Sequence, residues 1–300
     1  MNEPRVYLID SSIYIFRAWH IFDTGIRDSE GQAANAVFGF GDFLYHLLRQ
    51  KRPQYIACAF DFSQTDSWRK ELYPAYKANR EPAPQELRRQ FDLCRAFCRA
   101  IGIAEFGSTR YEADDIIGSL ARKYRERGFA ITVVSADKDL TQLITGEQDQ
   151  WWDFARSNLL DAKGIKQQFG VLPHLIADML AISGDKVDNI KGVPGIGYST
   201  AARILQKFDG IDSVLANLAQ VGAMKFRGAA RAQAQLRSHA HLLPLNKQLT
   251  TVYTQMEFPH DLDLAWRGVD PASLAELSAR LALGQALQQR WHRLQDQEPG

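Results

Sequence analysis

Hydrophobic residues in the first half of the chain gather in short runs, three of which end in an aspartate. The runs cover residues 6–10, 55–61 and 131–137 and finish at Asp10, Asp61 and Asp137. Each run is apolar almost throughout, as expected of a strand in a parallel sheet with both faces covered. The segments between the runs are long enough for the crossover helices that parallel strands require. The pattern therefore predicts a buried parallel sheet.

Helical periodicity marks the intervening segments. The expected helices lie near residues 33–50, 85–101 and 112–127. In the last of these, Ile116, Leu120 and Tyr124 belong to an apolar stripe, so this helix is expected to lie on the sheet. Alternating strands and helices predict an α/β domain with a mostly parallel central sheet and helices on both faces.

Beyond about residue 170 the pattern changes to short helices joined by Gly and Pro turns. We therefore expect an α/β catalytic domain over residues 1–170 and a helical subdomain over 171–256. Residues 257–300 form a C-terminal extension in this division.

Composition narrows the protein class. The chain has 300 residues, of which 45% are hydrophobic and 24% charged, so long disordered stretches are not expected. No apolar run approaches the roughly 18 to 20 residues that cross a bilayer, so we expect no membrane insertion. Three cysteines are a poor basis for a disulfide framework, which favours a reducing compartment and a cytoplasmic protein. We expect a monomer.

The charge is balanced overall but uneven along the chain. With 36 basic and 35 acidic side chains the net charge is +1, so a polyanion must be held by local patches. Residues 213–256 contain no acid. They carry five cations, Lys225, Arg227, Arg231, Arg237 and Lys247. Two interpretations stay open, a solvated helix face and a surface that meets phosphates.

Carboxylates recur where connections leave the predicted elements. Besides the three strand ends, the positions are Glu112, Asp114, Asp115, Asp139, Asp185 and Asp188. One aspartate at a strand end is typical of a turn or a helix cap, but the carboxyl ends of parallel strands meet at one edge. Converging carboxylates repel one another unless cations neutralise them, and oxygen-only ligands favour Mg²⁺ or Mn²⁺. Two such ions about 4 Å apart are suited to phosphodiester hydrolysis.

A glycine-rich hairpin lies further along the chain. Residues 192–197 read Gly-Val-Pro-Gly-Ile-Gly and lead into a helix that begins near Ser199 and Thr200. This is a helix-hairpin-helix signature, in which backbone N–H groups at a helix start approach a DNA phosphate. A helical segment and not a strand precedes the glycines, which disfavours a dinucleotide-binding fold.

Together these motifs resemble the 5′ nuclease family, which includes the 5′→3′ exonuclease domain of bacterial DNA polymerase I and the flap endonucleases. The matching segments are residues 6–10, 59–61, 111–115, 135–140 and 184–197. The resemblance covers about residues 4–258 and implies the PIN-like 5′ nuclease fold. It assigns Asp10, Asp61, Glu112, Asp114 and Asp115 to a first metal group. The second group comprises Asp137, Asp139, Asp185 and Asp188.

The resemblance also implies a helical arch over about residues 64–100. Within it, Lys77 and Arg80 match residues that contact the scissile phosphate, and Tyr76 is expected to stack on a base. Arg69 belongs to the same basic segment, which is expected to grip the DNA strand. Arg17 matches a position near the active site, so Lys77, Arg80, Asp115 and Arg17 are the expected catalytic residues.

The hairpin departs from the family pattern in ways that bear on DNA binding. Lys191 stands where Pro is usual, and Tyr198-Ser199 replaces the common Pro-Lys, which should weaken the grip on a duplex. Lys186-Val187 replaces small polar residues between Asp185 and Asp188, a departure that bears on affinity at the second metal. The expected DNA contacts here are Lys191, Gly192, Val193, Gly195, Gly197, Ser199 and Thr200. The family hairpin often holds a monovalent cation, K⁺, for which Ser183 is the candidate ligand.

The resemblance implies a free-standing, Mg²⁺-dependent 5′→3′ exonuclease or flap endonuclease with two ions, which Mn²⁺ can replace. Its expected partner is DNA with a 5′ flap, a nick or a free 5′ end. Two alternatives remain. One is a DNA-structure-binding protein with weak or no nuclease activity. The other is an RNA-directed PIN-like nuclease, which the presence of the hairpin disfavours.

Overall fold

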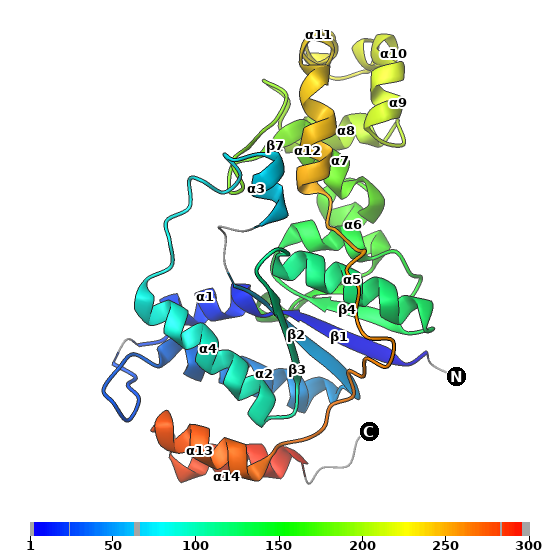
Figure 1. Ribbon diagram of the computed structural model, residues 1–300. Coiled ribbons are helices and arrows are strands. Elements are labelled where there is room, and N and C mark those ends of the chain that lie inside the picture. Colours follow the sequence, from blue (N-terminus) through cyan, green and yellow to red (C-terminus); the bar gives the residue numbers. More distant parts are fainter. Residues whose placement is uncertain (1–2, 24, 63–66, 283, 296–300) are drawn as a thin grey trace.

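The computed structural model describes residues 3–23, 25–62, 67–282 and 284–295, and it contains a six-stranded sheet in the order β3-β2-β1-β4-β5-β6 (Figure 1). The strands are β1 (Arg5–Asp10), β2 (Tyr55–Asp61), β3 (Ala104–Ser108), β4 (Ala130–Val134), β5 (Gln150–Asp153) and β6 (Asn158–Leu160). All neighbouring pairs are parallel except β5 with β6. The prediction of a mostly parallel sheet is confirmed.

Helices cover both faces of the sheet. On one face lie α1 (Ser11–Ile21), α2 (Asn35–Lys51) and α4 (Gln85–Ala100); on the other lies α5 (Ala113–Glu126). Successive side chains of a strand point to opposite faces, so Leu8 packs in the α5 core and Ile9 in the core of α1, α2 and α4. This two-sided burial explains the uninterrupted apolar runs. The three helices expected from the sequence are confirmed as α2, α4 and α5.

Residues 162–250, here called the helical half, are mainly helical, apart from a short hairpin of β7 (Gly184–Asp185) and β8 (Ile190–Lys191). Its elements are α6 (Ala162–Phe169), α7 (Ile176–Ser183), α8 (Tyr198–Leu205), α9 (Ile211–Ala216), α10 (Leu218–Gly222), α11 (Ala229–His239) and α12 (Leu243–Thr250). Short 3₁₀ turns join several elements, at Lys138–Leu143, Phe154–Arg156, Pro173–Leu175 and Ala240–Leu242. Met179 and Ile204 belong to the same hydrophobic cluster as Val6 and Ile117, so this half shares a core with the α5 face of the sheet.

An extended segment leads from α12 back to the sheet (Figure 1). Residues 251–268, here called the return strap, run along α5 and reach the start of β2, where the Ile56 amide donates to the Leu264 carbonyl. The chain then forms α13 (Pro271–Arg280) and α14 (Gln285–Gln295), which pack beside α4 and α2. No helix among the described residues is long and apolar enough to cross a membrane.

Candidate active site

The structure brings the three strand-end aspartates to one edge of the sheet. Asp10 closes β1 and accepts a hydrogen bond of 2.8 Å from the Ser135 hydroxyl, which follows β4. Asp61 closes β2 and accepts the backbone N–H of Ala113, at the start of α5, at 2.8 Å. β4 ends at Val134, so Asp137 lies in the following turn, where its carboxylate accepts the Asp139 N–H at 2.9 Å.

The acids at this edge oppose one another's ionisation. Burial, followed by the charges of Asp61 and Asp137, raises the pKa of Asp10 to about 7. Burial and the charges of Asp137 and Asp10 raise the pKa of Asp114 well above its ordinary value. Burial and Asp137 likewise raise the pKa of Asp139 to about 7. Negative charge is therefore concentrated here beyond what the surrounding groups compensate.

The four acids of the second predicted group share one pocket. A pocket of about 380 Å³ is lined by Asp137, Asp139, Asp185 and Asp188, together with Arg80, Lys138 and other residues. Among the described residues no three acidic, histidine or cysteine side chains already stand close enough to hold a metal ion. The donor set nonetheless fits a hard divalent cation, because it consists of crowded carboxylates and offers no thiolate or imidazole.

Three cations lie among these acids. The Lys77 ammonium is 3.0 Å from Glu112 Oε2, and Arg80 Nη2 is 2.6 Å from Asp188 Oδ1. Sequence reasoning missed the third, Lys138, whose ammonium is 3.0 Å from Asp139 Oδ1 and 3.4 Å from Asp185 Oδ2. Its position between two acids in the sequence gave no indication that its side chain turns inward.

The segment that carries Lys77 and Arg80 is fastened to the loop between β7 and β8. The Lys77 N–H donates to the Asp188 carbonyl at 3.0 Å, and the Asn189 amide donates to the Ala75 carbonyl at 2.7 Å. The Asn79 amide donates to the Lys186 carbonyl at 2.9 Å. Lys77 adopts a left-handed backbone conformation, with φ of 53°, which this docking holds in place. The start of the predicted arch, residues 64–66, lies outside the described residues.

The expectation that Tyr76 stacks on a base is contradicted by its burial. The side chain is 2% exposed, and its hydroxyl is 3.0 Å from both Glu112 Oε2 and Asp188 Oδ2. A phenol has one proton to donate, so it serves one of these carboxylates at a time. Tyr76 thus lies between the two predicted metal groups, and its ring is not available to a nucleotide.

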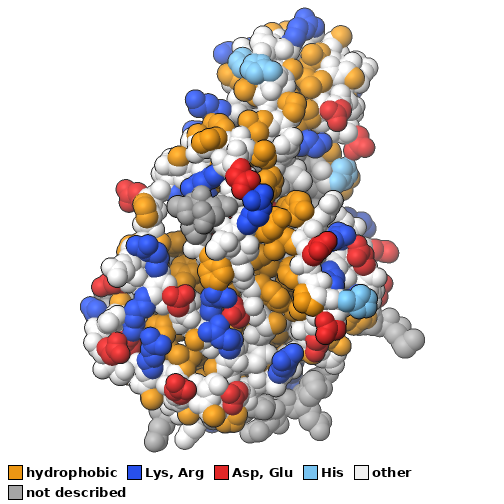
Figure 2. Space-filling model, viewed as in Figure 1, with side chains coloured by type: hydrophobic (Ala, Val, Ile, Leu, Met, Phe, Trp, Pro, Cys, Tyr) orange, Lys and Arg blue, Asp and Glu red, His pale blue; other side chains and the backbone are white. Residues whose placement is uncertain are grey.

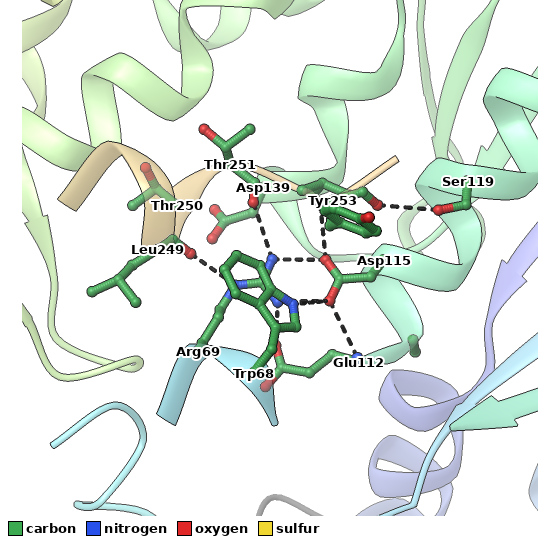
Figure 3. Close-up of polar contacts among 12 residues, drawn as sticks. Trp68, Arg69, Glu112, Asp115, Ser119, Asp139, Leu249, Thr250, Thr251 and Tyr253 are labelled. Carbon is green, nitrogen blue, oxygen red and sulfur yellow. Dashed lines mark hydrogen bonds and ion pairs between the residues drawn. The ribbon is translucent and has the colours of Figure 1, made fainter. Parts of the chain in front are cut away.

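Arg69 and Asp115 also differ from expectation, because they bind each other (Figure 3). Arg69 lies on α3 (Trp68–Leu72), is 3% exposed and reaches both oxygens of Asp115 at 2.8 Å. Asp115 is fully buried and also accepts the Trp68 indole N–H and the Tyr253 backbone N–H, each at 2.9 Å. Neither residue faces the acidic pocket, so Arg69 does not grip a strand and Asp115 has no oxygen free for a metal ion.

Glu112 lies between the Arg69–Asp115 pair and the cation Lys77. It caps α5 in a reciprocal capping box with Asp115, and its carboxylate meets Lys77 and lies 3.4 Å from Arg69 Nη1. Burial alone would raise the pKa of Glu112, but the charges of Lys77 and Arg69 hold that pKa below its ordinary value. Glu112 is therefore ionised, and cations of the protein already neutralise it.

A second pocket adjoins Asp61. It measures about 250 Å³ and is lined by Phe16, Asp61, Phe62, Arg80, Arg88, Phe91, Asp92 and Arg95. Arg80 lines both this pocket and the acidic one. Arg17, which was expected near the site, is exposed on α1 beside Phe16. Sequence reasoning missed this pocket, since its residues come from α1, the end of β2, the segment that carries Arg80, and α4.

The three glycines of the hairpin differ in what a side chain at their position would meet. A side chain at Gly192 would collide with the backbone of Gly184, its atom N lying 2.2 Å from the added Cβ. Gly195 has a φ of 78°, in the left-handed region that favours glycine. A Cβ at Gly197 would meet open space. Packing therefore does not require a glycine at position 197.

The other predicted hairpin contacts fall into two classes. Lys191 and Ser199 are exposed and Thr200 is half-buried, whereas Val193 is buried and its N–H donates to the Ile182 carbonyl at 2.8 Å. The Val193 N–H is thus already used in a hydrogen bond within the fold. It does not donate to a phosphate in this conformation, contrary to the expected DNA contact. The Ser183 hydroxyl donates to the Gly184 carbonyl at 3.1 Å.

Comparison with family descriptions finds two adjoining matches. The description "5′-3′ exonuclease, N-terminal resolvase-like domain" matches residues 5–170. The description "5′-3′ exonuclease, C-terminal SAM fold" matches residues 171–272. The two together span the sheet, the helical half and the return strap.

Curated relatives include whole polymerases and a shorter protein. DNA polymerase I of Bacillus caldotenax is 33% identical over 287 residues, covering 93% of this chain and 31% of the relative. DNA polymerase I of Pseudomonas aeruginosa is 36% identical over 269 residues, covering 89% and 29%. The 5′-3′ exonuclease of Aquifex aeolicus is 34% identical over 212 residues, covering 71% and 72%. The chain thus spans less than a third of the length of these polymerase relatives.

Solved structures share the fold at low sequence identity. The T5 5′-exonuclease with bound zinc has a TM-score of 0.66 at 18% identity, over 96% of this chain and 97% of that one. The catalytic core of Rad2 with a DNA substrate has a TM-score of 0.63 at 15% identity, over 97% and 92%. These likenesses confirm the expected arrangement of a sheet with a helical second half.

Proposed function

Because this chain belongs to the 5′-3′ exonuclease family, we propose that it is a divalent-metal-dependent nuclease that cuts DNA at a 5′ flap, a nick or a free 5′ end. The observation that carries the proposal is the acidic pocket, where Asp137, Asp139, Asp185 and Asp188 from separate elements line one space. A storage or scaffold protein has no reason to crowd carboxylates whose charges oppose one another.

The acids with raised pKa values and their neighbours are the ligands we propose. Asp10, Asp61 and Asp114, with Glu112, would hold one ion, and the four acids of the pocket would hold the other. Two Mg²⁺ ions, or Mn²⁺ in their place, would activate water and stabilise the charge that develops on the scissile phosphate. Asp115 is left out of this set because its oxygens already accept hydrogen bonds from Arg69, Trp68 and Tyr253.

Lys77 and Arg80 would bind the scissile phosphate. Burial opposes the charge of Lys77, but Glu112 and Asp188 raise its pKa to about 12, so the ammonium is protonated at neutral pH and does not act as a base. Both side chains lie where the acidic pocket meets the segment docked on the β7–β8 loop. Fixed cations at this place favour a dianionic transition state.

The helical half would bind the duplex. Arg231 of α11 lies beside the hairpin, because a Cβ built on Gly195 would be 3.9 Å from Arg231 Nε and Nη2. Lys225, Arg227, Arg231 and Arg237 are exposed, whereas Lys247 pairs with Asp178 at 2.9 Å. Figure 2 shows Lys and Arg side chains at the top of this half, where α11 lies. We propose that Arg231 supplies the cation that Tyr198-Ser199 removes from the hairpin, with Lys191 and Ser199 alongside.

Further expectations stand as proposals. The protein would act as a monomer. The division into residues 1–170, 171–256 and 257–300 would separate chemistry from duplex binding, and the hairpin would accept K⁺ near Ser183.

The test compares flap DNA with RNA of the same shape, each in Mg²⁺ or in chelator. We expect cleavage of the flap DNA in Mg²⁺ only, with duplex binding retained in chelator. Asp137→Asn should abolish cleavage, and Asp209→Asn, which alters an exposed acid of the helical half, should not. Binding without cleavage by the unmodified protein would favour a DNA-structure-binding protein. Cleavage of RNA alone would favour an RNA-directed nuclease.

A further inference from the structure

We infer that the buried pair of Arg69 and Asp115 is a joint between the acidic start of α5 and the helical half of the molecule. In this view Asp115 is a positioning residue and not a metal ligand. The inference rests on the proposed nuclease function for its turnover measurement and on the proposed metal site for its Mg²⁺ measurement. Its stability measurements are independent of any activity.

Arg69 uses every N–H donor of its guanidinium. Nε donates to the Leu249 carbonyl and Nη2 to the Thr251 carbonyl, each at 3.0 Å, at the C-terminal end of α12. The remaining donors reach Asp115, and Glu112 at 3.4 Å. The last carbonyls of a helix lack partners within the helix and carry partial negative charge. The Arg69 guanidinium therefore binds the C-terminal end of α12 and the N-terminal end of α5 at the same time.

Asp115 has no acceptor capacity left. Its two oxygens receive five N–H groups: two from Arg69, one each from the Trp68 indole and the Tyr253 backbone, and one from the Glu112 backbone at 3.3 Å. A carboxylate offers about four lone-pair sites. A metal ion would have to displace these donors from a fully buried position and leave the Arg69 charge unpaired.

The contacts continue from the joint to the proposed chemistry. On one side, Asp115 completes the capping box that holds Glu112, and Glu112 contacts Lys77. On the other side, α12 packs on α7, which leads directly into Gly184 and Asp185. A shift of the helical half when a duplex binds would therefore move Glu112 relative to Lys77, because the Lys77 backbone is docked on the β7–β8 loop.

The chain provides a matched control on the same helix. Glu71 of α3 and Arg110 form the same two-point ion pair, at 2.7 and 3.1 Å, but their side chains are 58% and 55% exposed. An exposed pair contributes little to stability because water screens it. Glu71→Gln thus reproduces the chemical change without the buried joint.

The first test measures melting temperature in chelator. Asp115→Asn should lower Tm by about 10 °C, because it leaves a buried guanidinium without its counter-charge. Glu71→Gln should lower it by about 2 °C or less. Asp114→Asn, which removes a repelling acid, should keep or raise Tm. The inference would be overturned if Asp115→Asn and the unmodified protein had the same Tm in chelator.

The second test removes both charges. Arg69→Met combined with Asp115→Leu should melt at a higher temperature than Asp115→Leu alone, because no uncompensated buried charge remains. Added Mg²⁺ should still raise the Tm of this double variant, whereas Asp114→Asn should lose most of that increase. If Asp115 were a metal ligand, the double variant would lose the increase as Asp114→Asn does, and the inference would fail.

The third test uses Arg69→Lys, which keeps the positive charge but loses the paired N–H donors that bind both oxygens of Asp115. With saturating flap DNA, we expect single-turnover cleavage to slow about 10-fold, since displaced catalytic groups cost rate. The Mg²⁺ concentration at half-maximal rate should stay within about twofold of the unmodified value. An unchanged cleavage rate in a variant with lowered Tm would show that the pair only supports the fold, and would refute its positioning role.

Discussion

Two charged regions of this molecule are built on opposite principles. At the carboxyl edge of the sheet, acids from several elements crowd together, and the pKa values of Asp10, Asp114 and Asp139 rise in consequence. On α11 and its approach, residues 213–256 contain cations and no acid, and most of these cations point into solvent. The first region concentrates charge at fixed positions for chemistry. The second presents dispersed charge, which suits a partner recognised by its backbone.

The first turn of α5 repeats the contrast on a smaller scale. Asp114 faces the uncompensated acids, whereas the neighbouring Asp115 meets five donors and a buried arginine. Adjacent residues of a helix point about 100° apart, so two identical carboxylates reach unlike surroundings. Residue type alone therefore does not identify a metal ligand.

The largest expected effect separates chemistry from binding. Asp114→Asn should lower the rate of single-turnover cleavage of flap DNA at least 100-fold. Loss of a residue that only supports a metal ligand costs roughly 10- to 100-fold in metal affinity or activity, and loss of a ligand should cost more. Duplex affinity in chelator should stay unchanged, because the hairpin and α11 are untouched. Fluorescence anisotropy with a labelled duplex measures the second quantity. Equal losses of cleavage and affinity would show that the acidic edge also binds the duplex, and would contradict the separation of the two regions.

Lys77→Ala should slow turnover by about 100-fold, since a fixed cation at the reacting phosphate is lost. Flap affinity should fall by less than about threefold. Lys186→Ala provides the control, because Lys186 is exposed on the facing loop and only its backbone carbonyl joins the docking contact. If Lys186→Ala slows turnover as much as Lys77→Ala, the effect is general electrostatics of the loop.

Arg231→Gln should weaken duplex binding about tenfold at low salt and leave the cleavage rate of bound substrate intact. The slope of log affinity against log salt concentration should decrease in magnitude by about 1, as expected for one lost phosphate contact. Titrations at several salt concentrations measure the slope. An unchanged slope would place Arg231 outside the interface.

Gly197→Ala should have the smallest effect, a two- to fivefold loss of duplex affinity at unchanged Tm. The added methyl group enters open space, so it strains nothing in the free protein and only limits how closely a phosphate approaches. Gly195→Val is a poorer probe, because the left-handed backbone of Gly195 would itself be strained. Wild-type affinity for Gly197→Ala would argue against close phosphate approach at this turn.

Much of this arrangement was accessible from the sequence. Apolar runs that end in aspartate predicted both the parallel sheet and the edge at which Asp10, Asp61 and Asp137 meet. On a helix that starts near residue 112, Glu112 and Asp115 share one face and Asp114 points elsewhere. The sequence could not show which of these faces looks into the pocket, because that depends on what packs against α5.

The missed features all depend on contacts between distant segments. Arg69 finds its partners more than forty residues away on α5 and about 180 residues away at the end of α12. Tyr76 lies in a basic, aromatic segment of the kind that contacts nucleic acid, yet tertiary packing buries it between Glu112 and Asp188. Lys138 stands in a turn, where its direction is set by the neighbouring pocket. Local pattern carries no information about such partners.

The hydrophobic cluster shared by the sheet and the helical half has a consequence for how the protein comes apart. Val6 and Ile117 pack in the same cluster as Met179 and Ile204, so the proposed boundary at residue 170 does not separate two folding units. Heating or denaturant should therefore produce a single cooperative transition, and neither half should survive as a stable fragment after the chain is cut near that point.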